Sequence, residues 1–230
     1  MSNTFKQLAE TAQKIAETRG TNAKIRICAG YLKDIKTDEH LNLAAQFLGE
    51  GAFSSLSGKR ASVGSRTYST AAAEFCEIDY DLVFKPCRTA LGSSSEAIEK
   101  LIRNVEAARK KQNPSQLSLG QVKSIYEQLY SVSSRADKQE ILQKAYTEMT
   151  PLEIKYFIRI MSQGSLRIGF ETRSLVSSLA KAFGKEVEDV RYAHMITGSI
   201  GRTAVLCRNE DLDEATFKLF HPLSFMLASP

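Results

Sequence analysis

The chain has 230 residues, enough for one large or two small domains, and 43% of them are hydrophobic and 25% charged, an ordinary globular composition. Its net charge of +5 and its isoelectric point near 9.0 favour a polyanionic partner only weakly. The N-terminus lacks the apolar core of a secretory signal, and no stretch approaches the roughly 18 apolar residues of a membrane span. We therefore expect a soluble intracellular protein without a membrane partner.

The cysteines and histidines argue against a metal or disulfide framework. None of the four cysteines forms a C-x-x-C pair, and each has small or apolar neighbours, which predicts buried free thiols in a reducing compartment. They are Cys28, Cys76, Cys87 and Cys207. The three histidines have no acidic or cysteine partners at ligand spacing, so we expect neither a metal site nor a bound cofactor in this chain.

The first half of the chain reads as short helices joined by glycine-rich corners. Thr4 and Gln7 form a predicted capping box ahead of an apolar helical face, and residues 37–39 open another helix. Two corners follow, at residues 58–64 and 92–97, each rich in glycine and in serine or basic residues. Alternating β-branched runs are missing, so we expect no strands here.

The second half repeats this order after a polar, proline-containing segment at residues 109–115. Ser118 and Gln121 form a second predicted capping box, and residues 150–153 open a helix with proline at its first position. Two more corners lie at residues 164–169 and 198–203.

Matched positions suggest an internal duplication. Ser118 follows Thr4 by 114 residues, and the same shift places Lys138 on Lys24. The later corners match at a shift of 106 residues, because the loops differ in length. We therefore predict an all-α fold of about ten to twelve short helices, forming a single domain of two pseudo-symmetric halves at about residues 1–110 and 115–215.

The four corners suit phosphate binding. Glycine lets the backbone approach a ligand closely, and the free amides of a helix N-terminus favour an anion. The structural alternative is that the glycines end helices, the serines cap them and the arginines are solvated. The recurrence of all four corners in register favours a functional role.

No motif predicts catalysis. Residues 51–59 superficially resemble a phosphate-binding loop, but the glycine spacing is wrong and Arg60 stands where a magnesium-binding Ser or Thr is required. The chain also lacks Gly-x-Ser-x-Gly and the Lys-x-Asp-Gly signature of covalent nucleotidyltransferases. We expect no enzyme activity from this chain alone.

Residues 149–169, with Met149-Thr150-Pro151-Leu152-Glu153 and Gly164-Ser165-Leu166-Arg167-Ile168-Gly169, resemble the second-half motif of the N-terminal DNA-binding domain of ATP-dependent DNA ligases, closest to the single-subunit type of bacteria and archaea. Residues 198–204 resemble the glycine-rich helix start of that family, and residues 216–230 resemble its lead-in to the nucleotidyltransferase domain. The chain departs from the family at Ser93, Ser199 and Arg202, where acidic residues are frequent, and its first-half loop lacks the Leu-Arg-Ile-Gly form.

The resemblance implies a monomeric, non-catalytic domain that binds nicked double-stranded DNA in the minor groove without reading sequence, and so supports nick sealing in replication, repair or recombination. Its implied partners are the nucleotidyltransferase and OB domains of the same enzyme, which would use ATP and Mg²⁺, in the cytoplasm or at the nucleoid of a prokaryote. The expected DNA-binding residues are Lys59, Arg60, Gly64, Arg66, Ser93, Ser94, Ser95, Gly164, Ser165, Leu166, Arg167, Gly169, Arg173, Ser199, Gly201, Arg202 and Thr203. Those of the first half follow only through the duplication.

Two other classes of function remain open at this point. A helical adaptor that binds a partner protein fits duplicated amphipathic helices equally well. An enzyme of unfamiliar type would have to show activity without any added partner.

Overall fold

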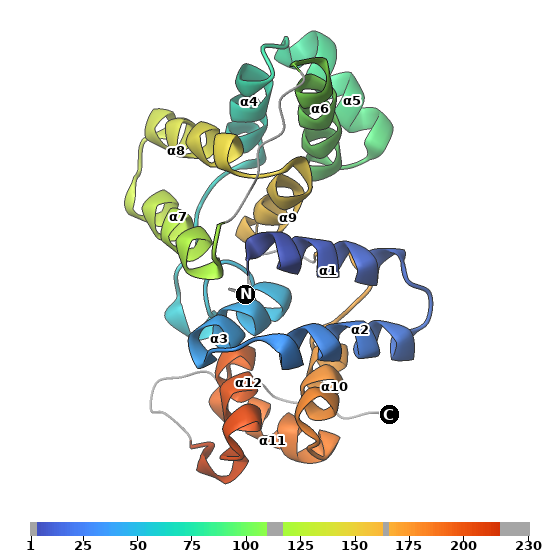
Figure 1. Cartoon of the computed structure of the whole chain (residues 1–230). Helices are drawn as coiled ribbons and strands as arrows, with labels where there is room; N and C mark the ends of the chain where they lie inside the picture. Colours follow the sequence, from blue (N-terminus) through green and yellow to red (C-terminus); the bar gives the residue numbers. More distant parts are fainter. Residues whose placement is uncertain (1–3, 110–116, 163–165, 217–230) are drawn as a thin grey trace, which may run out of the picture. The chain divides into compact units, whose positions relative to one another are not determined.

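The computed structural model describes residues 4–109, 117–162 and 166–216, which form twelve α-helices and no strand (Figure 1). The all-α prediction is therefore confirmed. The helices are α1 (Phe5–Glu17), α2 (Thr21–Asp34), α3 (Asp38–Gly49), α4 (Ser65–Phe75), α5 (Lys85–Leu91), α6 (Ser94–Arg109), α7 (Leu119–Ser131), α8 (Arg135–Glu148), α9 (Pro151–Met161), α10 (Thr172–Phe183), α11 (Val187–Thr197) and α12 (Ile200–Asn209). Three short non-α turns accompany them, η1 (Ser55–Ser57), η2 (Tyr80–Phe84) and η3 (Leu212–Glu214).

The helices begin where the capping residues predict. The Thr4 hydroxyl accepts from the amide of Gln7, while the Gln7 side chain accepts from the amide of Thr4. The same reciprocal pair forms between Ser118 and Gln121 ahead of α7. At α9 the box joins Thr150 to Glu153, with proline in the first turn. Each box satisfies two groups that a helix end would otherwise leave unpaired.

The chain divides into two compact units, and neither unit is one of the predicted sequence halves. In described residues, unit 1 comprises 11–59 and 166–216, and unit 2 comprises 4–10 and 60–162. Each unit therefore combines segments from both predicted sequence halves.

Unit 1 is built on two helix pairs, α2 against α10 and α3 against α12, with α11 beside α10 and α12. Its core contains the buried side chains of Leu32, Phe47 and Leu179. Arg208 near the end of α12 pairs with Asp38 at the start of α3 and donates to the carbonyl of Ile35. This polar contact fixes the ends of the α3–α12 pair.

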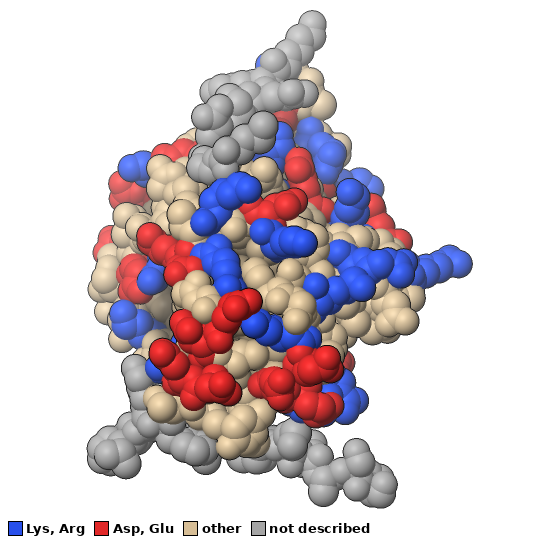
Figure 2. Space-filling view, turned by 60° about the horizontal axis from the view of Figure 1, so that its bottom comes forward, with Lys and Arg blue, Asp and Glu red and all other residues tan. Residues whose placement is uncertain are grey.

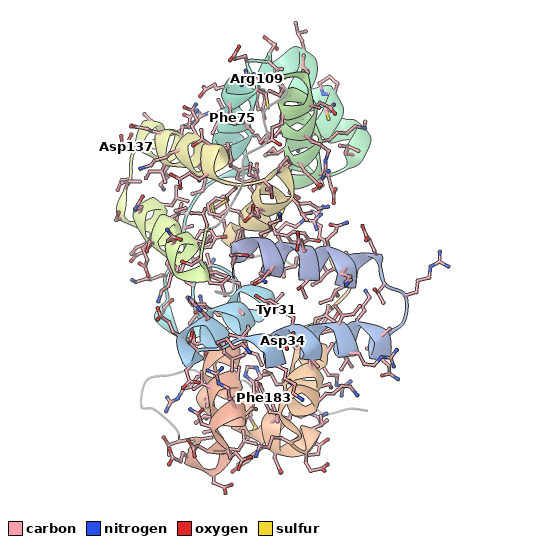
Figure 3. The ribbon with its side chains drawn as sticks, viewed as in Figure 1. Tyr31, Asp34, Phe75, Arg109, Asp137 and Phe183 are labelled. Atoms are coloured by element: carbon pink, nitrogen blue, oxygen red, sulfur yellow. The ribbon has the colours of Figure 1, made fainter. Side chains whose placement is uncertain are left out.

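Unit 2 has the corresponding pairs, α8 against α4 and α9 against α6. Tyr126 of α7 stacks on Phe157 of α9 with ring centroids 4.7 Å apart, and its hydroxyl donates to the Phe157 carbonyl. Phe75, labelled on α4 in Figure 3, and Tyr146 of α8 pack edge to face with ring centroids 6.1 Å apart. The buried Tyr146 hydroxyl donates to the carbonyl of Tyr68. The aromatic rings thus fill this core while their hydroxyls remain bonded.

The helix order gives each predicted half six helices, α1–α6 and α7–α12. Under the predicted match, α2 corresponds to α8 and α4 to α10, so the pair α2–α10 corresponds to α8–α4. Likewise α3–α12 corresponds to α9–α6. The duplication itself stays a prediction, but this exchange of partners explains why compact units and sequence halves differ.

Candidate nucleic-acid interface

The loop before α10 places one arginine on the surface between two buried side chains. We name residues 166–171 the Arg167 loop. Leu166 and Ile168 are 7% and 2% exposed, whereas Arg167 between them is exposed and has a left-handed backbone with φ of 55°. Arg173 in the first turn of α10 is also exposed. This end of unit 1 therefore presents two cationic side chains beside a helix N-terminus.

Glycine at position 169 meets a backbone requirement. Its φ is 58°, a conformation that residues with a Cβ rarely adopt. The predicted site residues Gly164 and Ser165 lie outside the described residues.

The corner at residues 198–203, which contains the expected DNA-binding residues Ser199, Gly201, Arg202 and Thr203, is mostly internal. Gly198 ends α11 in a left-handed conformation, and Ser199 caps α12 by accepting from the amide of Arg202. Ser199 is 7% exposed and Thr203 is fully buried, its hydroxyl bonded to the Ser199 carbonyl. The charged residue of this corner, Arg202, is half-buried.

Gly201 is buried for a packing reason. A Cβ at this position would lie 2.8 Å from the backbone oxygen of Asn42 in α3, closer than real Cβ contacts allow. The glycine therefore permits close approach of α3 and α12, a packing role that was not predicted from the sequence.

A carboxylate already occupies the N-terminus of α12. The Glu50 Oε1 accepts from the amide of Ile200 at 2.5 Å, and its Oε2 accepts from the amide of Ser55 at 2.8 Å. The Ser55 hydroxyl in turn donates to the carbonyl of Gly198. Because Glu50 neutralises the positive end of the helix dipole, a phosphate would compete with it there.

In unit 2, the loop before α4 has the same kind of backbone. We name residues 60–64 the Arg60 loop. Arg60 and Gly64 are exposed, and Ser62 has a left-handed backbone with φ of 48°. Arg66 in the first turn of α4 is exposed, with its guanidinium 3.6 Å from the centre of the Tyr80 ring. This contact orients the arginine side chain.

Lys59 belongs to unit 1, whereas the Arg60 loop that follows it belongs to unit 2. It is the last residue of the first segment of unit 1 and is half-buried.

The start of α6 mixes exposed and internal groups. Gly92 ends α5 in a left-handed conformation, and Ser93 and Ser94 are half-buried. Ser95 is 6% exposed and accepts from the Arg159 Nε at 3.1 Å, so its side chain supports packing against α9. Ser95, an expected DNA-binding residue, is therefore internal and serves helix packing.

Buried ion pairs join α6 to α9. Lys155 lies 3.1 Å from Glu96 and 3.0 Å from Glu99, and Arg159 also pairs with Glu96. The Lys155 and Arg159 side chains are each 7% exposed. Both cations thus hold two helices together and are not available to a ligand.

On the face drawn in Figure 2, lysine and arginine side chains are interspersed with aspartate and glutamate side chains. Charge alone therefore does not define a binding surface on this face. Within the described residues, no group of three or more metal-binding side chains gathers, and no helix is long and apolar enough to cross a membrane.

Residues 4–180 match the family model described as DNA ligase N terminus. This chain belongs to that family. Similar proteins include a probable DNA ligase of Koribacter versatilis, which is 31% identical over 226 residues. The matched region covers 97% of this chain and 37% of that relative. A DNA ligase of Methanothrix thermoacetophila is 28% identical over 243 residues, covering 97% of this chain and 40% of the relative. A probable DNA ligase of Opitutus terrae is 36% identical over 117 residues, covering 51% of this chain and 11% of the relative.

This member of the DNA ligase N-terminal family thus spans about two fifths of the first two relatives, 37% and 40% of their lengths. Three residues whose side chains bond to the backbone at these corners were not predicted as site residues, namely Lys24, which donates to the Ile168 carbonyl, Lys138, which donates to the Ser62 carbonyl, and Glu50. The matched sequence positions of the two lysines were the signal that could have identified them. No comparable sequence signal marks Glu50, whose partner Ile200 lies 150 residues away.

Proposed function

We propose that this chain is the non-catalytic DNA-binding domain of an ATP-dependent DNA ligase. It binds nicked duplex DNA in the minor groove without reading sequence and thereby supports nick sealing in replication, repair or recombination. The observation that carries the proposal is the Arg167 loop, where an exposed arginine stands between two buried anchors in a member of the DNA ligase N-terminal family.

Such a loop suits the sugar–phosphate backbone. Its buried neighbours fix the position of Arg167, so the side chain loses less freedom when it meets a phosphate. Phosphate contacts position a protein on a duplex but carry no sequence information, as nick sealing requires because nicks occur anywhere. The contributing residues are those with exposed or half-buried side chains or backbone at the corners, namely Lys59, Arg60, Gly64, Arg66, Ser93, Ser94, Arg167, Gly169, Arg173 and Arg202.

The remaining steps belong to parts of the enzyme beyond this chain. We propose that nucleotidyltransferase and OB domains of the same polypeptide use ATP and Mg²⁺, while this domain acts as a monomer in the cytoplasm or at the nucleoid. Relatives that extend well beyond the matched region support this division.

Fluorescence anisotropy with a labelled nicked duplex, over a salt series, tests the proposal. With about six phosphate contacts, the slope of log K against log salt should be roughly −5. A duplex of scrambled sequence should bind equally well. Incubation with labelled ATP and Mg²⁺ should leave no covalent label on the chain.

Failure to bind DNA at micromolar protein and low salt would overturn the proposal and favour the adaptor function. Binding that does not depend on salt would also contradict it, because counterion release accompanies phosphate contact.

A further inference from the structure

A lysine of α2 holds the backbone of the Arg167 loop. The Lys24 Nζ donates to the carbonyl of Ile168 at 2.6 Å and to that of Gly169 at 3.0 Å. These two carbonyls follow directly after Arg167. Both partners belong to unit 1, and they are separated by 144 residues or more in the sequence.

A lysine of α8 makes the matching contact in unit 2. The Lys138 Nζ donates to the carbonyl of Ser62 in the Arg60 loop at 3.1 Å. Lys138 corresponds to Lys24 at the 114-residue shift, and Ser62 corresponds to Ile168 at the 106-residue shift. A lysine-to-carbonyl contact therefore recurs in both units, at positions that the predicted duplication pairs.

Both loops need such support, because each contains a non-glycine residue in the left-handed backbone region, Arg167 and Ser62. This conformation is disfavoured for residues with a Cβ. An ammonium group that bonds nearby carbonyls stabilises the loop conformation through charge-assisted hydrogen bonds. At Gly169 the fit is close, since a Cβ there would lie 2.8 Å from the Lys24 Nζ.

We infer that Lys24 and Lys138 are positioning residues, which hold the Arg167 and Arg60 loops in their DNA-binding conformation and do not bind phosphate themselves. The inference rests on the proposed function for its consequence, but the loop contact can be tested without DNA. Lys24→Met and Lys138→Met keep the aliphatic stem and remove the ammonium group.

Each variant has a matched control on the same helix. Lys33→Met on α2 and Lys144→Met on α8 remove one positive charge from an exposed side chain. Thermal melting by circular dichroism establishes that each variant is folded. Because the two lysines lie in separate units, failure of one variant to fold leaves the other as a test.

Limited trypsin digestion, with cleavage sites quantified by mass spectrometry, reports on the loops directly. Loss of a charge-assisted hydrogen bond should raise local opening roughly tenfold. We expect Lys24→Met to accelerate cleavage after Arg167 by about this factor, and Lys138→Met to accelerate cleavage after Arg60. The controls should cleave at the unaltered rate. Unchanged cleavage in both test variants would overturn the inference.

A double-mutant comparison separates positioning from direct contact with DNA. We expect Lys24→Met to weaken binding of the nicked duplex about three- to tenfold, with no further loss when it is added to Arg167→Ala. Additive losses would overturn the inference, because they would mean that Lys24 contacts DNA independently. If the unaltered chain does not bind DNA, the proposed function fails, and the digestion alone decides whether the lysines hold the loops.

Discussion

The two compact units are built on corresponding pairs of helices, but one of these pairs is stabilised differently in each unit. In unit 1, α3 meets α12 through a glycine, with Gly201 against the backbone of Asn42. In unit 2, the corresponding pair of α9 and α6 is joined by charges, with Lys155 and Arg159 against Glu96. The α3–α12 interface therefore depends on close backbone approach, with the Arg208–Asp38 ion pair at its end, whereas the α9–α6 interface depends on ion pairs of buried cations.

Corners that match in sequence, such as the starts of α6 and α12, therefore need not have the same function. At the start of α12, Glu50 accepts from a backbone amide, so an acidic group stands where an anion would bind. At the start of α6, Glu96 points its carboxylate to the cations of α9. The exposed cations instead lie in and after the loops that precede α10 and α4.

Removal of the carboxylate at position 96 should have the largest effect on stability. Glu96→Ala takes away the acidic partner shared by two buried cations and should lower the free energy of unfolding by about 3 kcal/mol. Urea denaturation followed by circular dichroism measures the loss. Glu140→Ala, at an exposed position of α8, should change it by less than about 0.5 kcal/mol. Equal effects would show that the ion pairs contribute little.

A side chain at position 201 should have the next largest effect, now in unit 1. Gly201→Ala forces α3 and α12 apart and should cost about 2 kcal/mol in the same denaturation experiment. Gly30→Ala provides the control, because a Cβ on this α2 glycine would meet nothing within 4 Å. That control should gain about 0.5–1 kcal/mol from the higher helix propensity of alanine. A gain at both positions would contradict close packing at Gly201.

Neutralising the acidic cap of α12 should have a smaller effect. Glu50→Gln keeps the shape of the side chain but weakens its bonds to the amides of Ile200 and Ser55. We expect a loss of about 1 kcal/mol in unfolding free energy, because the charge no longer complements the helix dipole. Equal stability of the variant would mean that the carboxylate charge is not needed there.

Thiol labelling compares the two units without mutation. Burial raises the pKa of Cys28 and of Cys207 to about 12, and that of Cys76 to about 11. At pH 8 the thiolate fraction of Cys28 is on the order of 1 in 10,000. We expect only the half-buried Cys87 of unit 2 to react rapidly with a thiol reagent. Rapid reaction of a unit 1 cysteine would indicate that this unit opens locally.

Much of the local structure could be predicted because its causes lie close together in the sequence. Thr4 and Gln7, or Thr150 and Glu153, are three residues apart and specify a helix start by themselves. The helical periodicity likewise predicted the fold class, and burial of Cys28, Cys76 and Cys207 confirms the free-thiol prediction for those three.

Long-range packing set the limit of the prediction. Gly201 is internal because Asn42 lies against it, and Ser95 is internal because Arg159 reaches it. Neither partner is near in sequence, so from the sequence a glycine- and serine-rich corner appeared as well suited to binding a ligand as to helix packing. The pairing of helices from different sequence halves was likewise not predicted, because it also depends on contacts between residues distant in the sequence. By contrast, Arg167, another expected DNA-binding residue, is exposed.

The most direct test of DNA binding by the arginine-bearing loops is the salt dependence of binding by Arg167→Ala. The variant should bind a nicked duplex more weakly by about 1 kcal/mol, and its slope of log K against log salt should be smaller by about one unit. Its melting temperature should stay nearly unchanged, because the side chain is exposed. Lys144→Met, with the same change of charge, should keep the original slope. An unchanged slope for Arg167→Ala, or an equal reduction in the Lys144→Met control, would contradict the account.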